Sequence, residues 1–263
     1  MKRLVDLLRV NESRFTAIIL GAMTIAAVIN FNGQLGSGGG VPCLYDVYII
    51  GILHVVDTFG VPLLLFYTLF VERHNQRIMQ VVRERTVNDV WKRCVIDLLI
   101  LCTFFTVYVF ALTTIVGLLR TNTFYNWGEQ YSRCAKWLGK VCEEQPSFVM
   151  LLVAYVIETF QCFLITGIVM IGVWWCTNKE WAGYISAIIL ITIDRSFESH
   201  GLILGSYQVS SYTYKVGLNL GVNIIYPLIV MVIIFVAFYL PPQHPHYLPY
   251  LFYKVISFLH NLC

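Results

Sequence analysis

The chain has 263 residues, a length that would suit one or two soluble domains. Its composition excludes them: 58% of the residues are hydrophobic and only 13% are charged, whereas about a quarter of a typical soluble domain is charged. The net charge of +3 is too small for a protein that binds nucleic acid, and the chain is too apolar to be disordered. The composition indicates an all-α membrane protein in which residues 1–263 form a single transmembrane domain that contacts membrane lipid.

Six apolar segments are predicted to cross the membrane, because a spanning helix needs roughly 20 apolar residues. They are residues 15–31, 47–71, 95–119, 147–175, 181–194 and 216–240. The fifth is short for a span. Four prolines follow soon after the sixth and prevent its helix from continuing, so residues 241–263 are predicted to form a Pro- and aromatic-rich cytoplasmic tail.

The lysine and arginine residues predict the orientation, because they concentrate in cytoplasmic connections. Of the 18 basic residues, twelve lie on the side of the leader 1–14, the segment between the second and third spans, the connection after the fourth, and the tail. Six lie on the opposite side. Both termini are therefore predicted to be cytoplasmic. In the leader, Leu4, Leu7 and Leu8 share one helical face, which predicts a helix lying in the cytoplasmic interface.

Two connections are predicted on the exterior. Residues 32–46 are rich in glycine, but no Lys-Ser or Lys-Thr pair follows, so we expect a flexible connection and not a phosphate-binding loop. Residues 120–146 carry Cys134 and Cys142, which would be able to form a disulfide in an oxidising exterior. The sequence favours neither the disulfide nor two thiols.

Ionisable and amide side chains occur inside two predicted spans. His54 and Asp57 lie three residues apart in the second span, and Glu158 and Gln161 have the same spacing in the fourth. Such groups face another helix or a wet cavity, because exposing them to lipid is costly. One interpretation makes them part of a path for substrate or protons. The other, which the sequence alone favours, is that they form interhelical hydrogen bonds that fix the packing.

Catalytic and nucleotide-binding motifs are absent from the sequence. It contains no His-Glu-x-x-His pair, no Gly-x-Ser-x-Gly turn and no phosphate-binding loop. His244 and His246 in the tail have no third ligand near them in the sequence, so they do not make a metal site. We therefore expect a chain that is not an enzyme and has no cofactor or metal of its own.

The polar segment 72–93 between the second and third spans is too long for a turn. Ile78, Val81 and Val82 recur at helical spacing among charged residues, which predicts a short amphipathic cytoplasmic helix. Such a helix would suit docking onto a soluble partner. The alternative is an inert basic loop.

This arrangement resembles the permease subunit of a bacterial ABC exporter of the six-span type, the type V exporter fold. Four features carry the resemblance. They are the interfacial leader, the polar segment 72–85 that runs through residues 87–93 into the third span, the short fifth span followed by the mixed stretch 195–214, and Tyr226-Pro227 inside the sixth span. They extend over nearly the whole chain, and none is diagnostic alone. The cysteine-bearing loop 120–146 and the aromatic tail depart from the pattern.

The resemblance implies a coupling helix between the second and third spans and re-entrant helices between the fifth and sixth. It implies that separate ATP-binding cassette subunits, which bind ATP and magnesium, dock on that coupling helix, and that a second permease copy or a related permease completes the path. The residues implied in ATPase coupling are Arg77, Arg83, Glu84, Arg85, Trp91 and Lys92. The implied function is export or expulsion of a hydrophobic peptide or lipid-like substrate across the plasma (inner) membrane.

Two other functions remain open. The chain could be a non-catalytic sensor or assembly subunit whose exterior loop 120–146 binds a ligand. Alternatively, it could be a membrane-embedded lipid enzyme that uses His54, Asp57 or Glu158.

Overall fold

The computed structural model describes residues 13–37, 39–75, 87–139, 141, 147–196 and 224–239. Within this part of the chain the secondary structure is helical, and the only β-type pairing is an isolated bridge between Val41 and Ser132. The elements are α2 (Ser13–Ser37), α3 (Leu44–Ile50), η1 (Gly51–Gly60), α4 (Val61–Asn75), α6 (Val87–Arg120), α7 (Arg133–Leu138), α8 (Phe148–Thr177), α9 (Glu180–Ser196) and α11 (Tyr226–Tyr239).

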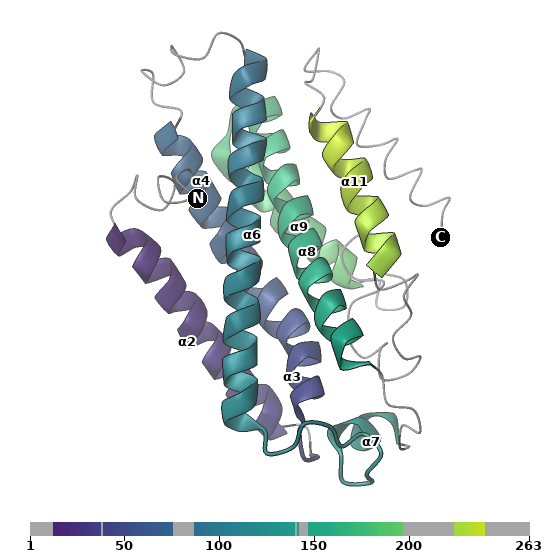
Figure 1. Ribbon diagram of the computed structural model, residues 1–263. Helices are drawn as coiled ribbons and strands as arrows, with labels where there is room; N and C mark the ends of the chain where they lie inside the picture. Colours follow the sequence, from purple (N-terminus) through teal and green to yellow (C-terminus); the bar gives the residue numbers. More distant parts are fainter. Residues whose placement is uncertain are drawn as a thin grey trace.

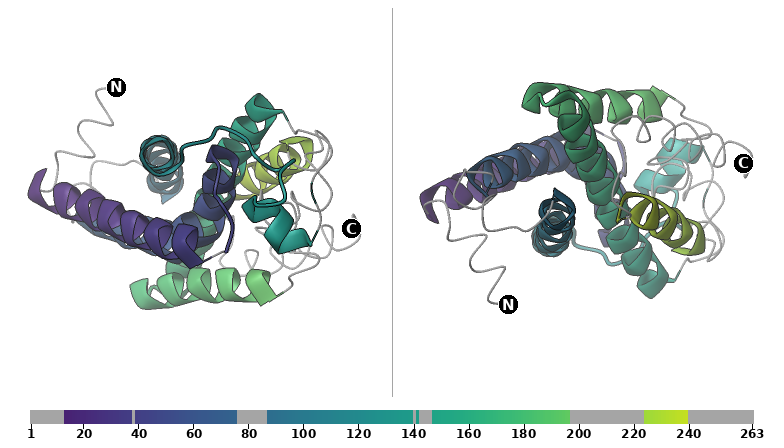
Figure 2. Two further views of the ribbon diagram at one scale, coloured as in Figure 1. Left: turned by 90° about the horizontal axis from the view of Figure 1, so that it is seen from below. Right: turned by 90° about the horizontal axis from the view of Figure 1, so that it is seen from above.

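The long helices form an elongated bundle (Figure 1). One end, which we call the α4–α6 end, holds the C-terminus of α4, the N-terminus of α6 and the short turn from α8 to α9. The opposite end, the α7 end, holds α7 and the segment that joins α6 to it. Figure 2 shows α6 nearly end-on along the bundle, whereas α2 and α9 are inclined to it. Helix α8 contacts α3, η1, α4, α6, α9 and α11, so it is the central packing element of the described residues.

Three helices of the described residues are long and apolar enough to cross a membrane: Phe15–Leu35 in α2, Asp89–Arg120 in α6 and Phe148–Thr177 in α8. They coincide with the first, third and fourth predicted spans. Large apolar side chains are exposed along them, including Ile25 of α2 and Val107 of α6. Because lipid is the solvent that tolerates such surfaces, the helices indicate a membrane protein, as the composition predicts.

The second predicted span corresponds to α3, η1 and α4, which follow one another without a break from Leu44 to Asn75. The middle part, η1, is a π-helix: the N–H of Val61 donates to the carbonyl of Val56, five residues earlier, where an α-helix would use the fourth. Pro62 follows directly. A proline ring inside an α-helix collides with the carbonyl four residues before it, so the wider turn of η1 gives Pro62 space.

Several boundaries differ from the prediction. Helix α2 continues to Ser37, so Gly33 lies inside a helix, and α6 begins at Val87, eight residues before the predicted third span. The glycine-rich connection is also fixed at its end: a Cβ on Gly40 would lie 2.8 Å from backbone atoms of Arg133. The stretch around Gly40 and Val41 thus packs against residues 131–133, a contact that the sequence did not predict.

The remaining predictions are tested only in part. Helix α9 coincides with the short fifth span, and α11 covers the later part of the sixth. The leader up to residue 12, the segment 76–86, residues 197–223 and the tail from residue 240 lie outside the described residues. The interfacial helix, the coupling helix, the re-entrant helices and the full set of six spans thus stay predictions.

Hydrogen bonds between tyrosine and threonine hydroxyls join the helices. Each bond links two helices that are distant in sequence, and its two oxygens lie 2.6–3.0 Å apart. The pairs are Thr16–Tyr67 between α2 and α4, Thr24–Tyr108 between α2 and α6, Tyr48–Thr114 between α3 and α6, and Thr113–Tyr155 between α6 and α8. In a membrane such bonds contribute about 0.6 kcal/mol each, up to about 1.7 kcal/mol.

Glycines set the closest helix approaches. Gly183 of α9 faces the backbone of α8, where a Cβ would overlap the carbonyl oxygen of Met170 and lie 3.1 Å from Trp174 Cβ. Gly167 of α8 faces Leu98 of α6, whose Cδ1 would be 2.5 Å from a Cβ there. Small residues let membrane helices approach closely enough for strong van der Waals contact.

We expect Gly183→Ala to destabilise the bundle by about 1–3 kcal/mol, because α8 and α9 must move apart to make room for the methyl group. Gly21→Ala is the matched control, since nothing lies within 4 Å of a Cβ at that position of α2. Alanine should stabilise that helix by about 0.5–1 kcal/mol. Unfolding of both variants in mixed micelles measures the difference, and equal stability of the two would contradict this packing.

Candidate functional site

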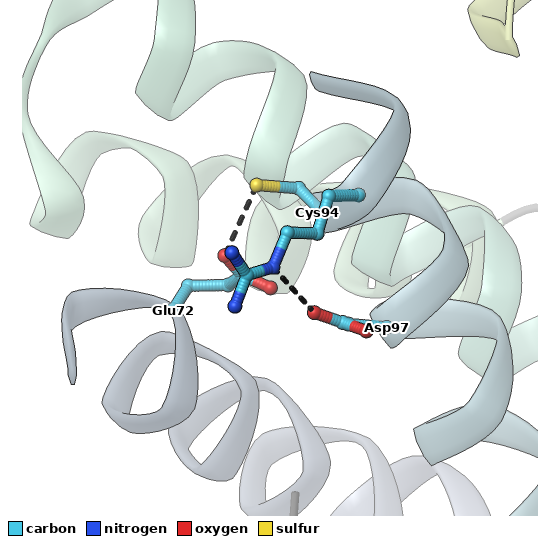
Figure 3. A network of polar contacts seen from close by, with 4 residues as sticks. Glu72, Cys94 and Asp97 are labelled. Atoms are coloured by element: carbon cyan, nitrogen blue, oxygen red, sulfur yellow. Dashed lines mark hydrogen bonds and ion pairs between the residues drawn. The ribbon is translucent and has the colours of Figure 1, made fainter. Parts of the chain in front are cut away.

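A buried polar cluster joins α4 to α6 at the α4–α6 end. The Cys94 thiol donates a hydrogen bond to Glu72 Oε2 over 3.0 Å, and Arg93 Nε lies 3.8 Å from Asp97 Oδ2. Figure 3 shows Glu72 extending from α4 toward Cys94 and Asp97 on α6. Glu72, Cys94 and Asp97 are all buried. We call these four residues the α4–α6 joint. Separating buried polar groups of this kind leaves them unsolvated, so the joint resists relative movement of the two helices.

Two further contacts extend the connection to α8 and α9. The Trp91 and Trp175 rings meet edge to face with centroids 5.3 Å apart, which packs α6 against α8. Arg73 and Glu180 form an ion pair over 3.8 Å between α4 and α9. Both side chains of that pair are well exposed, so it adds little stability. The four helices are nevertheless in contact at this end.

The predicted ATPase-coupling residues divide into two groups. Arg77, Arg83, Glu84 and Arg85 lie outside the described residues. Lys92 is partly exposed near the start of α6, whereas Trp91 is buried against Trp175. A partner docked at this end would therefore not touch the Trp91 ring, and Trp91 would influence coupling through the packing of α6 on α8.

The two pairs of polar residues in the predicted spans lie at one level of the bundle. Gly51 and Gly60, at the ends of η1, approach Tyr155 and Phe163 of α8, where a Cβ on either glycine would be 3.2 Å from the ring or hydroxyl. The backbone of η1 between them, which includes residues 54 and 57, therefore runs beside the part of α8 that includes residues 158 and 161.

Of these four residues, the structure describes the side chains of Glu158 and Gln161 of α8. Glu158 and Gln161 are 6% and 5% exposed. The side chains of His54 and Asp57 lie outside the described residues, so whether they meet Glu158 stays a prediction.

A second buried carboxylate organises the α7 end. Asp46, in the first turn of α3, is fully buried and accepts hydrogen bonds from the Cys43 backbone N–H at 2.8 Å and from Trp127 Nε1 at 2.9 Å. The partial positive charge of a helix N-terminus also stabilises a carboxylate there. Tyr45 packs against Phe124, Tyr125, Trp127 and Phe148.

Further contacts complete the structure of this end, which we call the α7-end cap and define as residues 39–46 and 121–139. Asn126 Nδ2 donates to the Val41 carbonyl over 2.8 Å, and the buried Arg133 donates to the Gln34 carbonyl of α2. Sequence analysis did not assign Asp46 or Trp127 to any site. The available signal was an acidic residue at the start of an apolar run, which also occurs in ordinary helix caps.

The cysteines of the cap are buried. Cys134 is fully buried, and Cys142 lies outside the described residues, so a Cys134–Cys142 disulfide stays a prediction. Burial, reinforced by the negative charge of Asp46, raises the pKa of the Cys43 thiol to about 12. The Cys43 thiol therefore stays protonated at physiological pH.

No group of three His, Cys, Asp or Glu side chains that could hold a metal ion occurs among the described residues. Comparisons with models of protein families, with characterised proteins and with solved structures give no match.

Alkylation of Cys43 at pH 8 should be slow, because raising a thiol pKa from 9.0 to about 12 lowers its thiolate fraction roughly a thousandfold. The rate should rise about tenfold per pH unit without a plateau up to pH 10. Peptide mass spectrometry of iodoacetamide-treated protein measures this rate, with the exposed Cys176 as internal reference. Asp46→Asn should speed the reaction only in part, since burial is the larger cause. Equal rates at Cys43 and Cys176 would contradict the buried cap.

Proposed function

We propose that this chain is the transmembrane subunit of an ATP-driven transporter whose ATP-hydrolysing subunits are separate proteins. The observation that carries the proposal is the α4–α6 joint. Glu72 lies in the last turn of α4, and Cys94 and Asp97 lie near the start of α6, so the joint ties together the two helices that flank the basic segment 76–86.

A partner bound to that segment would move a connected set of helices. The joint carries a displacement to α4 and α6, the Trp91–Trp175 contact carries it to α8, and the Arg73–Glu180 pair links α9. Rigid-body movement of helices between two packed states is a common transport mechanism. The arrangement at this end therefore supports the role of residues 72–93 as a coupling segment.

The proposal includes the complete topology. α2, the continuous α3–η1–α4, α6, α8, α9 and α11 are the six spans. The α4–α6 end and both termini face the cytoplasm, and the protein lies in the plasma (inner) membrane. The leader is an interfacial helix, and re-entrant helices precede the last span. The partners are an ATP-binding cassette subunit that holds ATP and magnesium, and a second permease copy or a related permease.

The proposed cargo is a hydrophobic peptide or lipid-like molecule that is exported or expelled. Support comes from the apolar helices and from the polar residues 54, 57, 158 and 161, which η1 and α8 carry at one level of the bundle. That level offers few polar groups in otherwise apolar surroundings, which suits a largely apolar cargo.

Reversing the charge of the basic segment tests this function. The triple variant Arg77→Glu, Arg83→Glu and Arg85→Glu should lose the co-purifying ATPase in mild detergent, because a basic docking surface would then repel its acidic counterpart. The measurement is ATP hydrolysis by the affinity-purified complex together with identification of the bound protein.

The matched control is Arg120→Glu with Lys136→Glu, which reverses two exposed charges at the α7 end. This control should keep the ATPase and its activity. A triple variant that binds the ATPase and hydrolyses ATP at the wild-type rate would refute the coupling role of the segment.

A second candidate function is a sensor or assembly subunit whose exterior segment binds a ligand. The α7-end cap favours it, because the hydrogen bond from Trp127 to Asp46 holds this segment against α3. In that case Trp127→Phe, which removes the hydrogen bond to Asp46, should reduce the cellular response to the ligand and leave ATPase co-purification unchanged. Loss of transport together with the response would favour the transporter instead.

A further inference from the structure

Two basic side chains and an indole ring gather at the start of α9. Arg73 of α4 forms an ion pair with Glu180 over 3.8 Å, and Lys179 directly precedes Glu180 in the chain. The ammonium nitrogen of Lys179 lies 5.6 Å from the centre of the Trp181 ring. Arg73 and Lys179 are exposed, and Trp181 is 62% exposed. Two cations meet one carboxylate here, so the three charged side chains together carry a net positive charge.

An exposed apolar stripe continues from Trp181 along α9. It consists of Trp181, Ile185, Ile189 and Ile193, which follow one another at intervals of one helical turn. The other side of the helix is buried at Gly183 and Ala187, and Gly183 packs on α8. Figure 2 shows α9 at the periphery of the bundle in both views. The stripe therefore faces the surroundings of the bundle, where the three long apolar helices indicate lipid.

The order of these groups along α9 matches the profile of one membrane leaflet. At a rise of 1.5 Å per residue, the stripe from Trp181 to Ile193 is about 18 Å long. Half of a hydrocarbon core about 30 Å thick is about 15 Å, so the stripe is long enough to follow one acyl chain. Tryptophan rings prefer the boundary between acyl chains and headgroups, and basic side chains extend from there to the headgroups.

We infer that the start of α9 binds the headgroup of an anionic phospholipid whose acyl chain lies along the apolar stripe. Arg73 and Lys179 contact the phosphate, because charge-assisted hydrogen bonds to phosphate are strong. The net positive charge selects a headgroup that is itself anionic, since the ammonium group of a zwitterionic headgroup would be repelled. The inference concerns this chain alone and depends neither on an ATPase partner nor on the orientation in the membrane.

The test uses the purified full chain in phosphatidylcholine nanodiscs. The probes are phosphatidylglycerol and phosphatidylcholine, each with a diazirine in the acyl chain and added at the same low mole fraction. After illumination, peptide mass spectrometry locates the lipid adducts. Adducts on α9 should form about five times more often with phosphatidylglycerol, since one basic charge near an anionic headgroup contributes about 1 kcal/mol. Sodium phosphate should compete no better than NaCl at equal ionic strength, because free phosphate lacks the acyl chain.

Three variants of exposed side chains, which rarely alter stability much, test the charges. Lys179→Gln should abolish the preference for phosphatidylglycerol on α9, whereas Lys179→Arg should keep it. Glu180→Gln should increase the preference about fivefold further, because it removes the carboxylate that opposes the two cations. Lys136→Gln, at an exposed position of the α7 end, is the matched control and should label like the wild type.

Equal labelling of α9 by the two lipids in the wild type would overturn the inference, because α9 would then contact lipid without selecting its charge. An unchanged preference in Lys179→Gln would overturn it as well. Displacement of phosphatidylglycerol by free phosphate beyond the effect of NaCl would show a simple anion site and would also contradict the proposed lipid.

Discussion

Hydrogen bonds between helices are the constraint on which this bundle depends. In water the apolar faces would drive assembly, but between helices surrounded by lipid that driving force is absent. The tyrosine–threonine pairs connect α2, α3, α4, α6 and α8, and the glycines of α8 and α9 allow close backbone contact. Polar groups at both ends work in the same way, because the buried carboxylates of Glu72 and Asp46 each accept a hydrogen bond from a side chain in another part of the chain.

Segment length was sufficient to predict most helices. The runs around residues 15–31, 95–119 and 147–175 each fall within a described helix that is long and apolar enough to span a membrane. Their ends were less predictable. Gly33 and Gly36 do not end α2, and the charged residues 87–93 belong to α6, because tertiary contacts such as Trp91–Trp175 outweigh local polarity. The π-helix had no separate signal, although Pro62 marked the place where an α-helix would be disturbed.

The candidate site was predictable only in its chemistry. An ionisable residue such as Glu158 in an apolar run is visible in the sequence, but its neighbours on other helices depend on crossing points. Gly51 and Gly60 determine which turn of α8 lies beside η1, and a glycine count does not reveal that they pack on Tyr155 and Phe163. The hydrogen bond between Trp127 and Asp46 could not be predicted for the same reason, because the two residues are 81 positions apart in the sequence.

The irregular helix η1 lies between two fixed points. Asp46 anchors α3 in the α7-end cap, and Glu72 anchors α4 in the α4–α6 joint, so both ends of α3–η1–α4 are held by buried hydrogen bonds. A π-helix has more residues per turn than an α-helix, so rewinding part of η1 would turn and lengthen this rod. The two anchors would then move relative to each other, and the part of α8 that packs on Gly51 and Gly60 would be displaced as well.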